Sequence, residues 1–205
     1  INESITNYKT AISLKSDFAE AYNNEGFAYE ALGKDDLALN SYQKATNLIP
    51  NYEKTYNNLG NLLNSLGKYD EAISVYSKAI KIKPDYAEAY NNLGTVMQKL
   101  YNLDEAIINY KKALKSKPNF AEAYNNLGAA LHKFGKFNDA INNYNQALKI
   151  NPNYEEALNN LGNTLFELGK FEEAILNHKK AININSGYAK AHSDLGIALT
   201  KIGII

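Results

Sequence analysis

The chain has 205 residues and a formal net charge of zero, because 22 basic side chains balance 22 acidic ones. This balance provides no overall field that would attract nucleic acid or an anionic membrane. The sequence contains no cysteine, which excludes disulfide frameworks, thiolate metal sites and cysteine nucleophiles. It also has no apolar run near the roughly 18 residues that a membrane-spanning helix needs.

One pattern of residues recurs every 34 positions along the chain, both in a Tyr-Asn-Asn-x-Gly motif and in the prolines Pro50, Pro84, Pro118 and Pro152. A period between 20 and 50 residues indicates stacked supersecondary units that bury their apolar faces against one another. The resulting division has five full repeats at 19–52, 53–86, 87–120, 121–154 and 155–188, with second-helix and first-helix half repeats at 1–18 and 189–205. We therefore expect a segment of a longer array.

Each block contains two stretches with apolar residues at helical spacing. In the block 53–86, Tyr56, Leu59 and Leu63 define one face of a first helix. A turn follows at Gly67, and a second helix then runs to Pro84. No alternation typical of strands appears, so the pattern predicts an all-α chain of helix pairs.

Eleven of the twelve glycines occupy two places in the block. One series lies within the first helices, at Gly26, Gly60, Gly94, Gly128, Gly162 and Gly196. Glycine inside a helix costs about 1 kcal/mol relative to alanine, so its recurrence predicts helices that approach too closely for a β-carbon. The other series marks the turns, where glycine adopts a positive φ easily. Tyr101 interrupts that series, and we expect Asn102 to take the left-handed conformation instead.

The repeated places resemble those of the tetratricopeptide repeat (TPR) family. In one block they are filled by Tyr90, Leu93-Gly94, Ala106, Tyr110, Ala113 and Pro118. The resemblance covers the whole chain. It implies a right-handed α-solenoid, a superhelix of antiparallel helix pairs, whose first helices line a concave groove for a protein or peptide partner.

Paired asparagines form a second recurring feature of the first helices. The first of each pair is Asn23, Asn57, Asn91, Asn125 or Asn159, and the second is Asn24, Asn58, Asn92, Asn126 or Asn160, with Ser193-Asp194 as the last variant. An asparagine amide has a donor and an acceptor that match those of a peptide backbone. Equivalent residues of adjacent repeats should lie on the order of 10 Å apart, or about three residues of an extended peptide. We therefore expect these residues, Asp194 included, to bind an extended peptide, with the second of each pair as the stronger candidate.

Two alternatives concern the same amides: contact with water on an exposed helix face, or bonding to the neighbouring helix. The ladder looks most like that of the superhelical TPR domain of O-linked N-acetylglucosamine transferases. In that family the residues equivalent to Asn24, Asn58, Asn92, Asn126 and Asn160 hold a polypeptide backbone, and Asp194 departs from the pattern. A carboxylate clamp is disfavoured, because the basic residues it needs are replaced by asparagines such as Asn23.

Other chemistry finds little support in the sequence. His178 and His192 occupy places that tyrosine holds elsewhere and are interpreted as packing residues, while His132 has no second ligand at metal spacing. Glu25 replaces a recurring leucine, where a charge is costly unless it is paired or exposed. We expect no catalytic residue, metal or cofactor.

The resulting hypothesis is a cytoplasmic, non-enzymatic scaffold for protein partners that binds neither nucleic acid nor membranes. Two alternatives stay open. One is the substrate-recruiting arm of a larger enzyme such as a glycosyltransferase. The other is a module that self-associates head to tail through its terminal half repeats.

Overall fold

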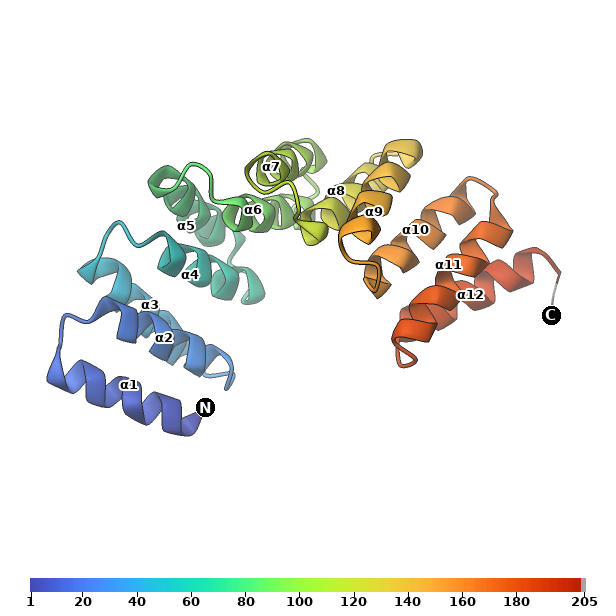
Figure 1. Cartoon of the computed structure of the whole chain (residues 1–205). Helices are drawn as coiled ribbons and strands as arrows, with labels where there is room; N and C mark the ends of the chain where they lie inside the picture. Colours follow the sequence, from blue (N-terminus) through green and yellow to red (C-terminus); the bar gives the residue numbers. More distant parts are fainter. Residues whose placement is uncertain (204–205) are drawn as a thin grey trace. The chain divides into compact units, whose positions relative to one another are not determined.

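The computed structural model describes residues 1–203, and every regular element in that range is a helix (Figure 1). The helices are α1 (Asn2–Leu14), α2 (Ala19–Glu30), α3 (Asp35–Leu48), α4 (Glu53–Ser65), α5 (Tyr69–Ile82), α6 (Ala87–Lys99), α7 (Leu103–Ser116), α8 (Ala121–Lys133), α9 (Phe137–Ile150), α10 (Glu155–Glu167), α11 (Phe171–Ile184) and α12 (Ala189–Lys201). The prediction of an all-α chain is confirmed. Ile204 and Ile205 lie outside the described residues.

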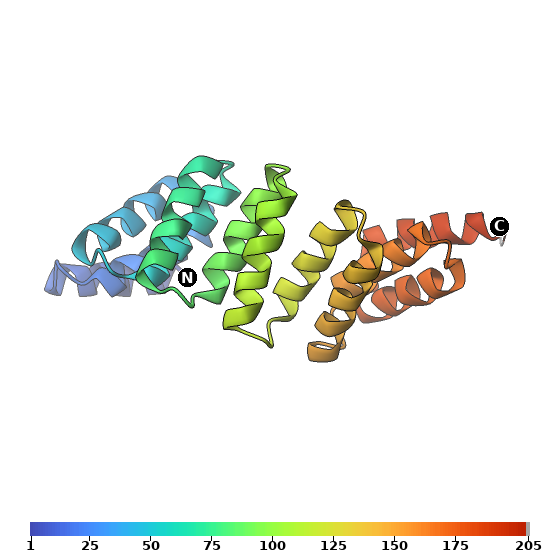
Figure 2. The same cartoon turned by 90° about the horizontal axis from the view of Figure 1, so that it is seen from above.

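The helices pack as consecutive antiparallel pairs. Within a repeat, α2 packs on α3, α4 on α5, α8 on α9 and α10 on α11, and the second helix of one repeat also contacts the first helix of the next, as α9 contacts α10. The chain forms two compact units, Ile1–Val96 and Met97–Ile205. Figure 2 shows the paired helices from a second direction.

A glycine in the left-handed conformation ends most first helices. Gly67 has a φ of 74°, and one residue later the Lys68 amide donates to the Leu63 carbonyl at 2.9 Å, as in a Schellman motif. Where glycine is missing, Tyr101 itself takes the left-handed conformation, with a φ of 60°. The expectation for Asn102 is therefore wrong: its φ is −86°, and its side chain caps α7 by accepting from the Glu105 amide.

The glycines within the first helices make room for an aromatic ring of the second helix. A β-carbon at Gly60 would lie 2.5 Å from the Tyr76 ring, and one at Gly162 would lie 2.6 Å from the His178 ring. Both rings are almost completely buried. The predicted close approach is confirmed at these positions, and so is the packing role of His178.

Glu25 is buried within the first unit and paired there. Its carboxylate accepts a hydrogen bond from the Ser41 hydroxyl at 2.8 Å, between α2 and α3. In the next repeat the same two places hold Leu59 and Val75, which are both buried. A polar pair thus stands where the next repeat has two apolar residues. Burying a carboxylate is costly unless it is hydrogen-bonded, and Ser41 provides that bond.

Candidate functional site

The asparagine pairs lie on the first helices, and the two members of a pair differ in exposure. The first asparagine is buried in every pair, with 7% of Asn23 and none of Asn159 exposed. The second asparagine is half-buried in every pair: Asn24, Asn58, Asn92, Asn126 and Asn160. The second member of each pair is therefore the one with substantial access to the surface.

Side-chain bonds connect the pairs of adjacent repeats. In the first unit the Nδ2 of Asn58 donates to the Oδ1 of Asn23 at 3.1 Å, and Asn92 donates to Asn57 at the same distance. In the second unit Asn160 donates to Asn125 at 3.0 Å. The second asparagine of one repeat thus bonds the first asparagine of the repeat before it. Bonding to the neighbouring helix, one of the two alternatives, is what these amides do.

Asp194 reverses the direction of this bond at the end of the series. A carboxylate only accepts, and it receives hydrogen bonds from Asn159 at 2.8 Å and from Asn163 at 2.9 Å. The Nδ2 of Asn159 makes this bond, while its Oδ1 bonds the Nδ1 of His178 at 2.8 Å. Asp194 therefore keeps the connection between repeats although the residue has changed.

The inter-repeat bonds use only part of the outer amides that make them. An asparagine side chain has two N–H donors and one carbonyl acceptor. Asn58 and Asn160 each use one N–H in their bond to the previous repeat, which leaves one N–H and the Oδ1. Asn92 donates a second time, to Asn61 at 2.9 Å, so that its Oδ1 remains.

A cavity of about 280 Å³ lies on the first-helix face of the second unit. Its lining comes mainly from first helices and consists of Gln98, Ala129, His132, Lys133, Tyr144, Glu156, Asn160, Asn163 and Lys190. It brings the predicted Asn160 together with both signs of charge. Burial lowers the pKa of His132, and the Nδ1 of its ring bonds the Thr164 hydroxyl at 2.9 Å.

His132 and Asn163 are among the lining residues that were not predicted from the sequence as part of the groove. Asn163 follows Asn160 by three positions, a spacing that places both side chains on one helix face. That spacing was the available signal. His132 carried none, because no other block has histidine at its place.

Among residues 1–203 no cluster of histidine and acidic side chains could hold a metal ion. None of the helices in the same range combines the length and the apolar character required to cross a bilayer.

Two models of the tetratricopeptide repeat match residues 19–52 and 41–74, and a TPR repeat model matches residues 1–33, 60–100, 102–135, 130–169 and 162–203. No curated protein has a matching sequence.

Solved structures resemble the chain over most of its length. The crystal structure of YrrB, described as a TPR protein with an unusual peptide-binding site, is 25% identical, covers 91% of this chain and 96% of its own, and has a TM-score of 0.68. MamA is 27% identical over 80% of this chain and 96% of its own, with a TM-score of 0.70. TTC0263, a TPR protein of Thermus thermophilus, shares the fold, at 21% identity, 89% and 99% coverage, and a TM-score of 0.74. The repeat matches and the helix pairs together show that the chain belongs to the tetratricopeptide repeat family.

Proposed function

We propose that the chain is a protein-interaction module that binds an extended peptide segment of a partner along its first helices. The observation that carries this proposal is the half-buried second asparagine of each pair, which in Asn58 and Asn160 retains hydrogen-bonding capacity beyond its bond to the previous repeat. The outer asparagines Asn24, Asn58, Asn92, Asn126 and Asn160 hold the peptide main chain, and Asp194 extends the series as an acceptor.

The first asparagines serve this binding indirectly. Asn23 and Asn125 are buried and accept from Asn58 and Asn160, so each fixes the orientation of the outer amide that follows. An amide held in one orientation loses little conformational freedom when a peptide binds, and this preorganisation favours affinity. Asn57 acts on Asn92 in the same way, and we assign the corresponding supporting role to Asn91.

The likeness to YrrB supports this proposal at the level of the family. YrrB is described as having a peptide-binding site, and it matches nearly the whole of this chain. The cavity next to Asn160 adds Lys133, Lys190 and Glu156, which provide side-chain selectivity beyond main-chain recognition.

Main-chain recognition is tested by altering the peptide backbone alone. The probe is a set of capped, fluorescent 15-residue peptides without secondary structure, each compared with a copy carrying N-methyl groups at every third residue. Each methyl group removes one donor, so affinity should fall about 2- to 10-fold per lost hydrogen bond. Equal affinity of the two copies would contradict the proposal.

A matched pair of protein variants locates the site. Asn160→Ala removes an outer amide on the first-helix face, whereas Asn142→Ala removes an exposed amide from the second helix α9. The first variant should weaken peptide binding by a similar factor and the second should leave it unchanged, with thermal unfolding showing that both remain folded. If both variants bind equally well, the outer asparagines do not hold the peptide.

The glycosyltransferase-arm alternative requires the same peptide-binding face and differs only in what is joined to it. It is decided by whether the reading frame that contains this chain also encodes a transferase. Without such a domain, the finer resemblance to the O-linked N-acetylglucosamine transferases describes the binding mode alone.

Head-to-tail association is favoured by one specific observation. A β-carbon at Gly196 on α12 would meet nothing within 4 Å, whereas an equivalent glycine such as Gly60 meets a second-helix ring. Tyr8 on α1 stands at the place of those rings, and it is half-buried. Packing of Tyr8 from one copy against Gly196 of another would complete a repeat.

Light scattering tests this association, because the average mass should rise with protein concentration. Ile197→Glu, at an exposed position on α12, should prevent the rise. A constant monomer mass of the unaltered chain excludes the association.

A further inference from the structure

One aromatic place in the repeat is filled by leucine in the second unit. First helices carry tyrosine there at Tyr22, Tyr56, Tyr90 and Tyr124, but the helix α10 carries Leu158. In the first unit a lysine of the second helix covers this ring: the Nζ of Lys44 lies 5.4 Å from the centre of the Tyr22 ring, and Lys78 lies 5.8 Å from that of Tyr56. Lys180 on α11 stands at the place of Lys44 and Lys78, but no ring precedes it at position 158.

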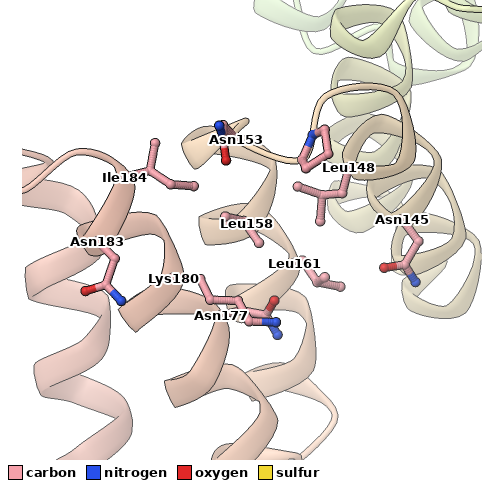
Figure 3. A pocket seen from close by; sticks show the side chains of 10 residues that line it. Asn145, Leu148, Asn153, Leu158, Leu161, Asn177, Lys180, Asn183 and Ile184 are labelled. Atoms are coloured by element: carbon pink, nitrogen blue, oxygen red, sulfur yellow. The ribbon is translucent and has the colours of Figure 1, made fainter.

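A cavity of about 470 Å³ lies where that ring would be. Its lining consists of Asn145, Leu148, Pro152, Asn153, Leu158, Leu161, Asn177, Lys180, Asn183 and Ile184. Figure 3 shows these side chains converging from α9, α10 and α11 and from the loop that carries Asn153. The corresponding hollow beside Tyr56, lined by Pro50, Asn51, Lys78, Lys81 and Ile82, measures about 340 Å³.

The lining has the character that an aromatic ring requires. Leu158 and Leu161 are both 6% exposed and, together with Leu148, provide an apolar wall. The amide of Asn177 donates to the Glu173 carbonyl at 2.9 Å, which leaves its Oδ1 as an acceptor. Lys180 adds a cation at the place from which lysine covers a ring elsewhere.

We propose that this cavity is a binding site for a phenol-type aromatic ring, which occupies the space left by the missing tyrosine. The ring packs on the leucines and receives the Lys180 ammonium on its face, just as Tyr22 receives Lys44 and Tyr56 receives Lys78. Its hydroxyl faces the asparagine amides at the rim. Lysine above a ring contributes about 0.5–1 kcal/mol at an exposed site. The lining of this cavity contains none of the outer asparagines, although α10 carries Asn160, so the two sites are separate.

The test uses three probes and reads the methyl NMR signals of Leu148, Leu158, Leu161 and Ile184. The probes are p-cresol, its saturated counterpart 4-methylcyclohexanol, and the capped peptide acetyl-Gly-Tyr-Gly-amide. We expect p-cresol to shift these signals at millimolar concentration and to bind more tightly than the saturated alcohol, which has no π face. If neither p-cresol nor the peptide shifts them, or if the alcohol binds as tightly as p-cresol, the proposal is overturned.

Two variants separate ring binding from general hydrophobic binding. Leu158→Tyr restores the residue of the other repeats, so it should fold normally and weaken the binding of p-cresol by occupying the ring position and reducing the cavity toward the hollow of about 340 Å³ found beside Tyr56. Lys180→Met keeps the aliphatic stem and should weaken p-cresol about two- to fivefold while leaving 4-methylcyclohexanol unchanged. Unchanged affinity of p-cresol for the folded Leu158→Tyr variant contradicts the assignment.

The peptide distinguishes the source of the ring. Peptide binding at least as tight as that of p-cresol identifies a tyrosine side chain of a partner as the ligand. Binding of p-cresol alone identifies a free phenolic molecule. Both results support the phenol site.

Discussion

The repeat 53–86 in the first unit and the repeat 155–188 in the second share one helical framework, but they differ at positions that line surface cavities. In both, a first-helix glycine receives a ring from the second helix, Tyr76 on Gly60 in one and His178 on Gly162 in the other. In both, a turn glycine of positive φ, Gly67 or Gly169, ends the first helix. The backbone therefore depends on a few small residues and tolerates a change of ring.

The differences change what each repeat can bind. Tyr56 fills its place under Lys78, whereas Leu158 leaves a larger cavity under Lys180. Substitutions inside a repeated framework thus alter surface chemistry without altering the fold. Replacing a residue by its equivalent from another repeat should therefore change stability or binding in the direction expected from the packing around that equivalent residue.

The largest effect is expected where the first repeat departs from the second. Replacing the buried pair Glu25 and Ser41 by Leu and Val reproduces Leu59 and Val75 of the next repeat. Apolar replacement of buried ion pairs often stabilises by about 1–4 kcal/mol, and we expect the same direction for this carboxylate–hydroxyl pair, so the free energy of unfolding in urea should rise. Ser41→Val alone serves as the control and should destabilise, since it leaves the Glu25 carboxylate buried without its donor. A loss of stability in the double variant would show that the polar pair is stabilising.

The glycines of the first helices offer a matched comparison. Gly60→Ala places a methyl group 2.5 Å from the buried Tyr76 ring, and overpacking of this kind costs about 1–3 kcal/mol. Gly196→Ala meets nothing within 4 Å and should stabilise by about 1 kcal/mol, the difference in helix propensity. Thermal unfolding should therefore shift in opposite directions for the two variants. A shift in the same direction would mean that helix propensity, and not ring contact, explains the recurring glycine.

A smaller effect is expected at the turn that lacks glycine. Tyr101 has a φ of 60° and is 88% exposed, so its ring contributes little packing to offset the strained backbone. A non-glycine residue in this conformation costs roughly 1–2 kcal/mol. Relief of this strain should raise the free energy of unfolding of the Tyr101→Gly variant, and the net gain should be about 1 kcal/mol, since the extra freedom of glycine in the unfolded chain offsets part of it. Gly67→Tyr, the reverse exchange, should lower it; if Tyr101→Gly is destabilising, the turn is not strained.

Most of the fold was predictable because the packing signals are local and repeated. The spacing of Pro50, Pro84, Pro118 and Pro152 marks the ends of repeats, and glycine within a helix indicates close contact. The left-handed residue was mispredicted because intrinsic preference favours asparagine over tyrosine in that conformation. The Schellman bond from the Asn102 amide to the Met97 carbonyl instead requires the residue before Asn102, which is Tyr101, to be left-handed.

The candidate site was less predictable, since an amide serves a neighbouring helix as well as a ligand. The sequence Asn-Asn places Asn125 and Asn126 side by side, but only the stacking of the next repeat decides which member is buried. Leu158 fits the apolar stripe equally well as a tyrosine does. The cavity under Lys180 depends on how side chains of three helices and a loop pack together, which the pattern of residue types does not reveal.

The smallest effect is expected on the pH dependence of stability, where the buried His178 ring should differ from the buried Tyr144 ring of the previous repeat. Burial lowers the pKa of His178 and so favours the neutral ring in the folded chain, where its Nδ1 bonds the side-chain oxygen of Asn159. With the folded pKa below the unfolded value of about 6.5, the unfolded chain binds more protons in acid, and stability contributed by the neutral ring is lost as the pH falls from about 6.5 through the folded pKa. His178→Tyr, the residue of Tyr144 in the previous repeat, should flatten the decline in the free energy of unfolding measured from about pH 7 to about pH 5. Tyr144→His should steepen it, and unchanged slopes in both variants would show that this ring does not contribute to the acid sensitivity of the chain.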